Sequence, residues 1–172
     1  MTIKNIEVSI VEKAYEEGWL KPQIPKYRLE EKIAVIGSGP AGLSCAMYLR
    51  RLGYGVSLFE KDKLPGGLNT YGVAEYKMDQ KTSLAEAKSI LDMGVDVRMG
   101  IDVGKDIAFD ELLREFAAVF IGIGLGETRP LKIPGEDLPG VLDALSFIRR
   151  VKARELQFIP QSAVTIVIGA GN

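Results

Sequence analysis

The chain has 172 residues, with 22 basic and 23 acidic side chains, a single cysteine and no histidine. This length suits one domain with a sizeable core, and the balanced charge gives no electrostatic reason to expect nucleic acid as a partner. The lone cysteine excludes an internal disulfide and an iron–sulfur centre built by this chain alone, and the lack of histidine excludes His-based triads and metal sites.

No apolar run reaches the roughly 18 residues that a membrane span needs, and no signal-peptide pattern opens the sequence. We therefore expect no membrane association. The lack of disulfides favours a reducing, cytoplasmic setting.

The chain is expected to begin with a helical arm. Ile3, Ile6, Ile10 and Ala14 recur at helical spacing, and Gly18 is a suitable stop. Residues 21–32 hold two prolines and six charges, which indicates a linker. We assign the arm and linker to residues 1–29 and a main domain to residues 30–160.

The main domain opens with an apolar strand at residues 33–36, a glycine turn and a helix over 41–52. Gly37, Gly39 and Gly42 form the G-x-G-x-x-G pattern of a dinucleotide site. The first glycine allows the tight turn, the second lets backbone approach a pyrophosphate, and the third lets the helix pack close to the sheet. The ligand's negative charge would face the helix N-terminus.

A second strand over Tyr54–Phe59 ends at Glu60, 18 residues after Gly42. A carboxylate at this position can accept hydrogen bonds from both hydroxyls of a ribose. The alternative is an ordinary strand–helix–strand unit with a surface glutamate.

The next segments contain two further glycine clusters. Residues 61–77 are too irregular for a helix. Their Pro-Gly-Gly at residues 65–67 is expected to let the backbone run flat against a bulky ligand, with a glycine-rich surface loop as the alternative. A helix over 81–93, a strand over 95–98, a helix over 107–115 and a strand over 117–123 follow. The glycines at 122–126 suggest close packing on the first glycine turn or on its ligand, with a simple turn as the alternative.

Residues 130–141 form an extended strap because three prolines and two glycines forbid regular structure. A helix over 143–156 carries basic side chains that we expect to be solvated, with an anionic partner as the alternative. Residues 163–168 are then an apolar strand, followed by Gly-Ala-Gly-Asn. We therefore assign residues 161–172 to the first strand of a second nucleotide-binding domain, and we expect the chain to be a fragment of a longer protein.

The chain resembles the flavin-dependent, NADPH-oxidising module shared by the glutamate synthase small chain and dihydropyrimidine dehydrogenase. The resemblance covers essentially the whole chain. It is carried by Ala14–Trp19, Gly37–Gly42, Pro65–Leu68 with Tyr71–Val73, and Ile133–Asp137, while Phe120–Leu125 and Ile166–Asn172 favour the dihydropyrimidine dehydrogenase branch. It implies an α/β fold: a Rossmann-like FAD-binding domain with a parallel sheet and flanking helices.

The resemblance also implies roles for individual residues. The FAD pyrophosphate would lie on Gly37, Ser38, Gly39, Pro40, Ala41 and Gly42, and the adenosine ribose on Glu60 and Lys61. The flavin side would be lined by Gly67, Leu68, Tyr71 and Gly72, the adenine would meet the backbone of Val103, and Gly124 and Gly126 would pack near the pyrophosphate. The NADPH site would begin at Gly169, Gly171 and Asn172.

The whole enzyme would pass hydride from NADPH to FAD and single electrons to iron–sulfur clusters, without a catalytic side chain. This chain departs from the pattern: the cysteine-rich cluster segment, most of the NADPH domain and the C-terminal return to the FAD domain are missing. The resemblance therefore implies clusters only in missing segments or a partner subunit, no NADPH turnover by the isolated chain, and self-association through exposed apolar surface.

Two other functions remain open from sequence. A single NAD(P)-binding dehydrogenase domain would share the glycine pattern and Glu60, but it would not need the loop at residues 65–71. A non-catalytic assembly unit is the other alternative. The final electron acceptor and the choice between NADPH and NADH are not decided by these residues.

Overall fold

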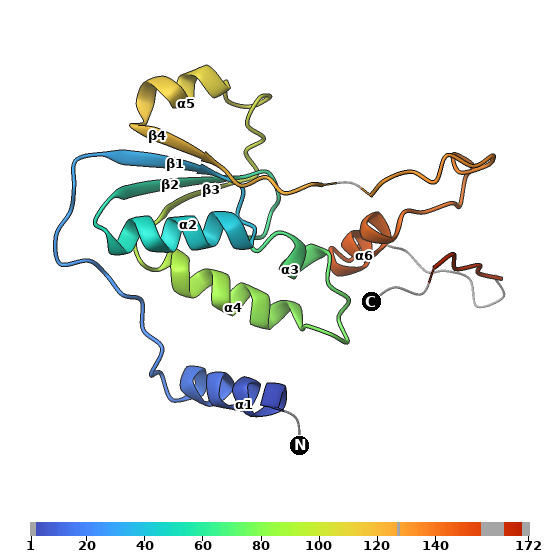
Figure 1. The fold of residues 1–172 in the computed structure, drawn as a ribbon, viewed down its shortest axis with the longest axis horizontal. Coiled ribbons are helices and arrows are strands. Elements are labelled where there is room, and N and C mark those ends of the chain that lie inside the picture. The colour runs from blue at the N-terminus through green and yellow to red at the C-terminus, as the bar shows by residue number, and fades with distance from the viewer. Residues whose placement is uncertain (1–2, 127, 156–163, 170–172) are drawn as a thin grey trace.

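The computed structural model describes residues 3–126, 128–155 and 164–169. Its centre is a four-stranded sheet in which every neighbouring pair is parallel (Figure 1). The strands are β1 (Lys32–Ile36), β2 (Gly55–Glu60), β3 (Asp96–Met99) and β4 (Ala118–Ile121), in the order β3-β2-β1-β4. This arrangement confirms the α/β fold expected from the sequence.

Helices cover both faces of the sheet. The helices of the described chain are α1 (Ile3–Glu16), α2 (Pro40–Arg51), α3 (Leu68–Tyr71), α4 (Gln80–Leu91), α5 (Phe109–Glu115) and α6 (Ala144–Lys152). In Figure 1, α2 and α4 lie on one face of the sheet and α5 lies on the other. The chain moves outward from β1 to β3 and then crosses to β4 on the other side of β1, so the strand order reverses between β1 and β4.

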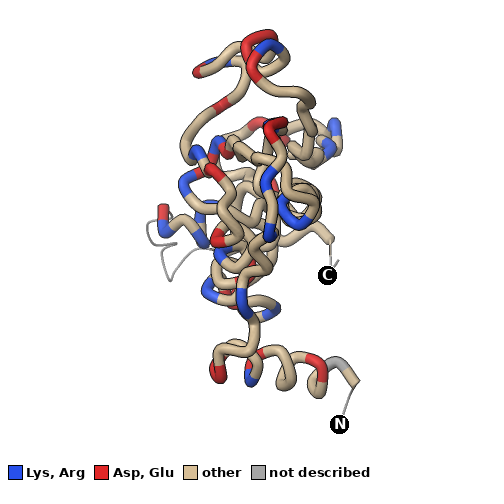
Figure 2. Tube along the Cα trace, turned by 90° about the vertical axis from the view of Figure 1, so that its left-hand side faces the viewer, with Lys and Arg blue, Asp and Glu red and all other residues tan. Residues whose placement is uncertain are grey.

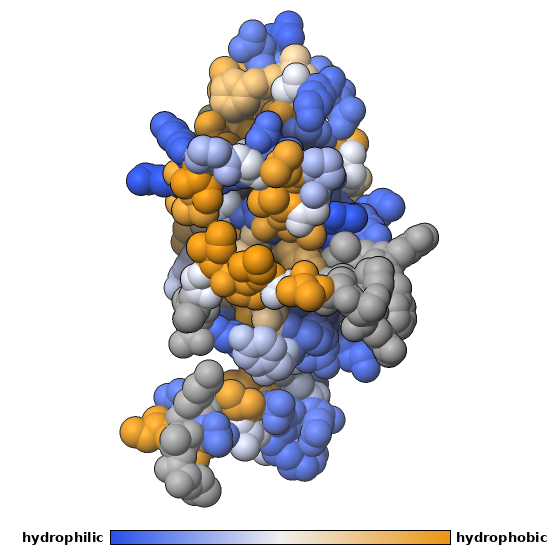
Figure 3. Space-filling model, turned by 90° about the vertical axis from the view of Figure 1, so that its right-hand side faces the viewer, coloured by the Kyte–Doolittle hydropathy of each residue, from blue (hydrophilic) through white to orange (hydrophobic). Residues whose placement is uncertain are grey.

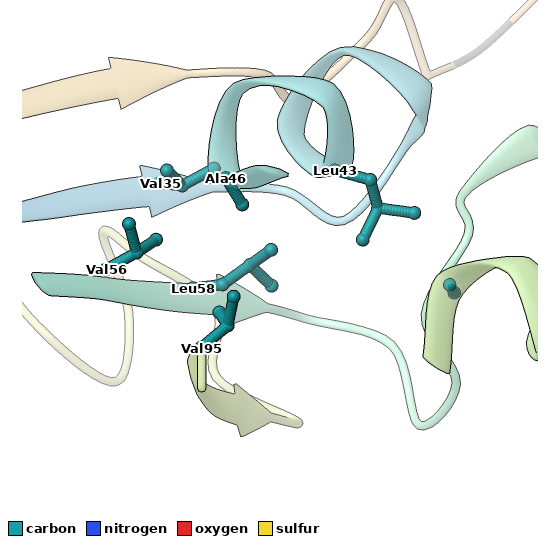
Figure 4. Packing of buried hydrophobic residues seen from close by; sticks show 7 residues of the cluster. Val35, Leu43, Ala46, Val56, Leu58 and Val95 are labelled. Carbon is teal, nitrogen blue, oxygen red and sulfur yellow. The ribbon is translucent and has the colours of Figure 1, made fainter. Parts of the chain in front are cut away.

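One hydrophobic core lies between the sheet and α2. Val35 and Leu58 are fully buried here and pack with five other buried residues: Leu43, Ala46, Val56, Ala87 and Val95. Figure 4 shows side chains of β1 and β2 pointing toward α2. Burying one such aliphatic side chain contributes about 1.5–3 kcal/mol, so this cluster fixes the helix that starts at the glycine turn.

A second core lies on the opposite face, beneath α5. Alternate residues of β1, Ala34 and Ile36, point into it, as the two-residue repeat of a strand requires. They pack with Phe59, Leu112 and Phe116, and the two phenylalanine rings meet edge to face at 6.0 Å. Because both faces of β1 are covered, residues 33–36 of this strand are a continuous apolar run in the sequence.

The N-terminal arm is helical, as predicted, and α1 lies apart from the sheet in Figures 1 and 2. Its isoleucines and valines are exposed, and Trp19 beyond it is 66% exposed. Figure 2 also shows basic and acidic positions interspersed along the chain. Among the described residues, no helix combines the length and apolar character needed to cross a bilayer.

The strap at residues 130–141 lacks helix and strand, as predicted. Its path is shaped by Glu136, whose two carboxylate oxygens accept the backbone N–H groups of Leu131 and Lys132, each over 2.7 Å. Figure 3, which faces the side of the molecule with the strap and α6, shows hydrophobic side chains gathered across this face. Exposed apolar residues of the strap and the segment that follows are Leu131, Ile133, Leu138, Val141 and Leu142.

Two expectations about local structure are wrong. Residues 65–77 contain the short helix α3, which starts after Gly66 and Gly67 have turned the backbone with positive φ angles of 109° and 55°. Residues 164–169 form no strand, because no described segment lies beside them to complete a hydrogen-bonded ladder. Their apolar side chains, Val164, Ile166, Val167 and Ile168, are at least 75% exposed.

Candidate nucleotide-binding site

The glycine turn after β1 is packed against its neighbours without space for side chains. Gly37 has a φ of 93°, and a Cβ added there would lie 2.5 Å from the carbonyl oxygen of Gly122. A Cβ on Gly42 would lie 1.9 Å from the carbonyl oxygen of Gly37. Both distances are too short for any real contact, so the turn, the end of β4 and the start of α2 require glycine at these positions. The predicted roles of Gly37 as the turn residue and Gly42 as the close-packing residue fit this geometry.

The outer side of the same turn is open. A Cβ built on Gly39 meets no atom within 4 Å, and Pro40 and Ala41 are exposed. Gly39 is the N-cap of α2, and no side chain among the described residues bonds to this helix end. The first N–H groups of a helix lack intrahelical partners and carry partial positive charge. The turn therefore presents backbone donors and an accessible surface suited to an anion.

Glu60 lies at the carboxyl end of β2, beside this turn, and it is only 5% exposed. Its Oε2 accepts the N–H of Ser38 over 2.8 Å and the hydroxyl of Ser38 over 2.5 Å. Its Oε1 accepts the N–H of Asp62 over 2.8 Å. The predicted ribose acid is therefore held in place by the chain itself. Ser38, predicted to lie along a pyrophosphate, is fully buried and directs its hydroxyl to Glu60 instead.

The loop after β2 packs directly on the glycine turn. The N–H of Gly66 donates to the Ser38 carbonyl oxygen over 3.0 Å, and a Cβ on Gly67 would lie 2.8 Å from Gly39 Cα. From the other side, the buried hydroxyl of Thr70 donates to the Pro65 carbonyl oxygen over 2.5 Å. The same Thr70 hydroxyl lies 2.8 Å from the hydroxyl of Ser83 on α4. The loop is thus fixed between the turn and α4.

Tyr71 and α6 give a contact that the sequence did not predict. Tyr71 is 7% exposed, its hydroxyl accepts the N–H of Leu64 over 3.0 Å, and burial raises the pKa of its phenol. The guanidinium of Arg149 lies 4.8 Å from the centre of the Tyr71 ring and pairs with Asp62. The Lys152 side chain is 2% exposed; its amine donates to the Met78 carbonyl oxygen over 3.2 Å.

The expectation that the basic side chains of α6 are solvated is therefore wrong for Lys152, whereas the Arg149 side chain stays 45% exposed while it pairs with Asp62. Lys152 also pairs with Glu75 over 3.3 Å. Glu75 and the Met78 carbonyl oxygen draw Lys152 inward, while Arg150 stays exposed. We call this contact between α6 and residues 62–78 the α6 clasp.

The remaining described residues of the predicted site lie outside the four strands. Lys61 and Leu68 are exposed, and Gly72 ends α3. Val103 lies two residues after Ile101. The N–H of Ile101 donates to the Glu60 carbonyl oxygen over 2.9 Å and ties this segment to the end of β2. Gly124, Gly126 and Gly169 have positive φ angles, and a Cβ on any of them meets no described atom within 4 Å. Gly171 and Asn172 lie outside the described residues.

Gly122 makes the close contact that was expected of the glycine cluster after β4. A Cβ on Gly122 would lie 3.2 Å from the N atom of Gly42. A sequence signal exists for this residue, because Gly122 follows the last residue of β4 as Gly37 follows the last residue of β1. Thr70, Arg149 and Lys152 carry no comparable signal, since their partners lie elsewhere in the sequence.

A parallel sheet of order β3-β2-β1-β4, a glycine turn after β1 and an acid at the end of β2 define a dinucleotide-binding unit of the Rossmann type. The chain matches the pyridine nucleotide-disulphide oxidoreductase family over residues 31–172 and belongs to this family of enzymes.

Curated relatives include the glutamate synthase [NADPH] small chain of Mycobacterium tuberculosis, which is 40% identical over 86% of this chain and 30% of its own length. The glutamate synthase [NADPH] small chain of Bacillus subtilis is 37% identical over 100% of this chain and 36% of its own length. These identities confirm the resemblance to glutamate synthase small chains. This chain spans about a third of the length of these relatives. The resemblance to dihydropyrimidine dehydrogenase stays a prediction.

Among solved structures, FprA from Mycobacterium tuberculosis in complex with NADPH is similar to this chain. The two are 29% identical with a TM-score of 0.64, over 72% of this chain and 29% of FprA. The similarity agrees with the fold derived above from the sheet order and the glycine turn.

Proposed function

We propose that this chain binds FAD through the glycine turn, Glu60 and the loop at residues 65–71, as the FAD-binding part of an NAD(P)H-dependent oxidoreductase. The observation that supports this proposal most strongly is the position of the Glu60 carboxylate, which accepts a hydrogen bond from the N–H of Ser38, the second residue of the glycine turn. An acid for a ribose and an uncapped helix N-terminus for a pyrophosphate thus lie at one sheet edge, where open α/β sheets bind ligands.

The described residues fit the adenosine diphosphate half of FAD. The pyrophosphate takes the open side of Gly39, where a side chain would occupy the ligand's space. The adenosine ribose faces Glu60 and Lys61, and the adenine meets the backbone of Val103. Gly67, Leu68, Tyr71 and Gly72 line the path toward the flavin, while Gly124 and Gly126 border the pyrophosphate. The protein's task here is to bind and orient the cofactor, because FAD itself supplies the hydride chemistry.

In the whole protein we propose that NADPH is the hydride donor and that iron–sulfur clusters in other segments or in a partner subunit accept the electrons. Gly169, Gly171 and Asn172 belong to the start of the NADPH site in this proposal. The names of the relatives that contain "NADPH" support it, as does the complex of FprA with NADPH. Residues 1–172 alone are expected to lack NADPH oxidation with an added electron acceptor.

The test is the visible absorption spectrum of the purified chain after incubation with FAD and gel filtration. We expect a retained flavin band in the wild type and a much weaker band in Glu60→Gln, because the amide cannot accept from a ribose hydroxyl at both of its atoms. Glu86→Gln, an exposed change on α4, is the matched control and should behave as wild type.

Two results would contradict the proposal. A colourless wild-type chain would rule out FAD as a ligand of residues 1–172. A chain that binds NADP+ in calorimetry but retains no FAD would favour the alternative of a single NAD(P)-binding domain.

A further inference from the structure

Ser38 uses both of its donors on one oxygen of Glu60. Its N–H and its hydroxyl reach Oε2 over 2.8 Å and 2.5 Å, and neither the Ser38 side chain nor its backbone is exposed to solvent. The N–H of Asp62 donates a hydrogen bond to Glu60 Oε1. The free chain therefore supplies three donors to a carboxylate that is 5% exposed.

This arrangement limits what else Glu60 can accept. A carboxylate offers about four lone-pair positions on its two oxygens. The three donors leave about one position, on Oε1, whereas a ribose offers two vicinal hydroxyls that both need an acceptor. Both hydroxyls can be accepted only when one of the chain's own donors withdraws.

The donor that can withdraw is the Ser38 hydroxyl. The N–H groups of Ser38 and Asp62 are fixed by the turn after β1 and by the end of β2, but a hydroxyl can change rotamer without moving the backbone. The Gly66 N–H lies 3.0 Å from the Ser38 carbonyl oxygen and 3.3 Å from the Ser38 hydroxyl oxygen. It keeps the shorter bond to the carbonyl oxygen when the hydroxyl turns away, so the loop stays attached to the turn.

We propose that the Ser38 hydroxyl stands in for one ribose hydroxyl: it satisfies Glu60 in the free chain and gives up Oε2 when a ligand with a ribose diol binds. This inference rests on the proposed function, because it concerns the same acid. It assigns Ser38 as a residue that lowers ligand affinity through Glu60 and stabilises the empty site. Removing the Ser38 hydroxyl should therefore lower the stability of the free chain and raise its affinity for the ligand. A serine with a purely structural role would lower stability without raising affinity.

The test compares Ser38→Ala with Ser57→Ala. Ser57 is a matched control, since it is 7% exposed, lies in β2 and donates its hydroxyl to Asp96 Oδ2 over 3.0 Å. In the ligand-free chain, urea unfolding should give Ser38→Ala an unfolding constant about tenfold higher than wild type, as expected for a lost hydrogen bond to a charged group. Titration with FAD should give Ser38→Ala a Kd about tenfold lower, because no hydroxyl has to be displaced. Ser57→Ala should lose stability with an unchanged Kd.

A second ligand shows whether Ser38 acts through the diol. An FAD analogue with 2′-deoxyadenosine offers one ribose hydroxyl, which fits the single free position on Glu60. Wild type and Ser38→Ala should therefore bind this analogue with equal Kd. Equal effects of Ser38→Ala on FAD and on the analogue would overturn the inference.

The remaining outcomes are also decisive. FAD binding to Ser38→Ala that is weaker than or equal to wild type, or an unchanged stability of the free variant, overturns the inference while the proposed function stands. If no variant binds FAD, the proposed function fails and the ligand half of the inference fails with it. The stability loss in Ser38→Ala then still decides whether the hydroxyl stabilises the empty site.

Discussion

Arg149 of α6 pairs with Asp62, 87 residues earlier and two residues beyond Glu60. The same guanidinium lies over the Tyr71 ring, so one side chain of α6 holds both the start of the 62–78 segment and the end of α3. Through these contacts α6 stabilises the segment that follows Glu60 and forms part of the candidate site.

We predict that removing the α6 clasp loosens residues 62–78. Arg149→Ala combined with Lys152→Ala should lower the free energy of unfolding by about 1–3 kcal/mol, since hydrogen bonds to charged groups and a cation–π contact are lost. Amide hydrogen exchange at residues 64–78 should become faster. Arg150→Ala, which changes an exposed cation of the same helix, is the control. Unchanged exchange in the double variant would show that α6 does not support this segment.

Gly37→Ala should destabilise the chain through two effects, a positive φ and a clash with the carbonyl oxygen of Gly122. Gly104→Ala separates them, because Gly104 has a φ of 102° and no atom lies within 4 Å of its added Cβ. We expect about 1–2 kcal/mol for Gly104→Ala from backbone strain and at least about 2 kcal/mol more for Gly37→Ala. Chemical denaturation measures both. Equal losses would mean that the contact with Gly122 is not tight.

Cys45 should react slowly in the folded chain. Burial raises the pKa of its thiol, and the thiolate is the reactive form, so less thiolate exists at pH 8 than in the unfolded chain. Because it is the single cysteine, uptake of iodoacetamide followed by mass spectrometry reports on this site alone. We expect alkylation to be at least about tenfold faster in urea and to rise with pH. Similar rates in the folded and unfolded chain would contradict this.

The exposed apolar side chains of the strap predict self-association. Light scattering should give a mass above the 18.8 kDa of one chain. Leu131→Ser combined with Leu138→Ser should lower that mass, since both side chains are 60% exposed. Tyr76→Ser, which changes an 85% exposed side chain outside the strap, is the control. A wild-type mass equal to one chain would disprove the prediction.

Local sequence patterns were sufficient to predict most of this fold. Apolar runs predicted β1 and β4, and the segment after the first helix predicted β2. The run in β1 is apolar because this strand is covered on both faces. The turn after β1 was predictable because its glycines stand at a recognised spacing, and Gly42 is required by a contact with Gly37, five residues earlier. The position of Glu60 followed from the length of the strand–helix–strand unit.

The parts that could not be predicted depend on contacts between distant segments. The inward position of Lys152 depends on the Met78 carbonyl oxygen, 74 residues earlier, and basic residues on a short helix more often face solvent. The strand expected at residues 163–168 has a suitable composition, but strand formation also depends on a neighbour for pairing. The bond from Ser38 to Glu60 has no signature in sequence, because a serine after a glycine can face either the ligand or the protein.

The packing of Gly37, Gly42 and Gly122 has a consequence for how such a site evolves. Where these three glycines meet, the contact surface of the turn, the start of α2 and the end of β4 consists mostly of main-chain atoms, which are the same whichever amino acids are encoded. Point mutation can therefore abolish this surface but cannot adjust it by degrees. Gradual change in ligand preference has to come from the few side chains beside the three glycines, above all Ser38 and Glu60. Selection should therefore preserve the glycines and allow the neighbouring side chains to vary.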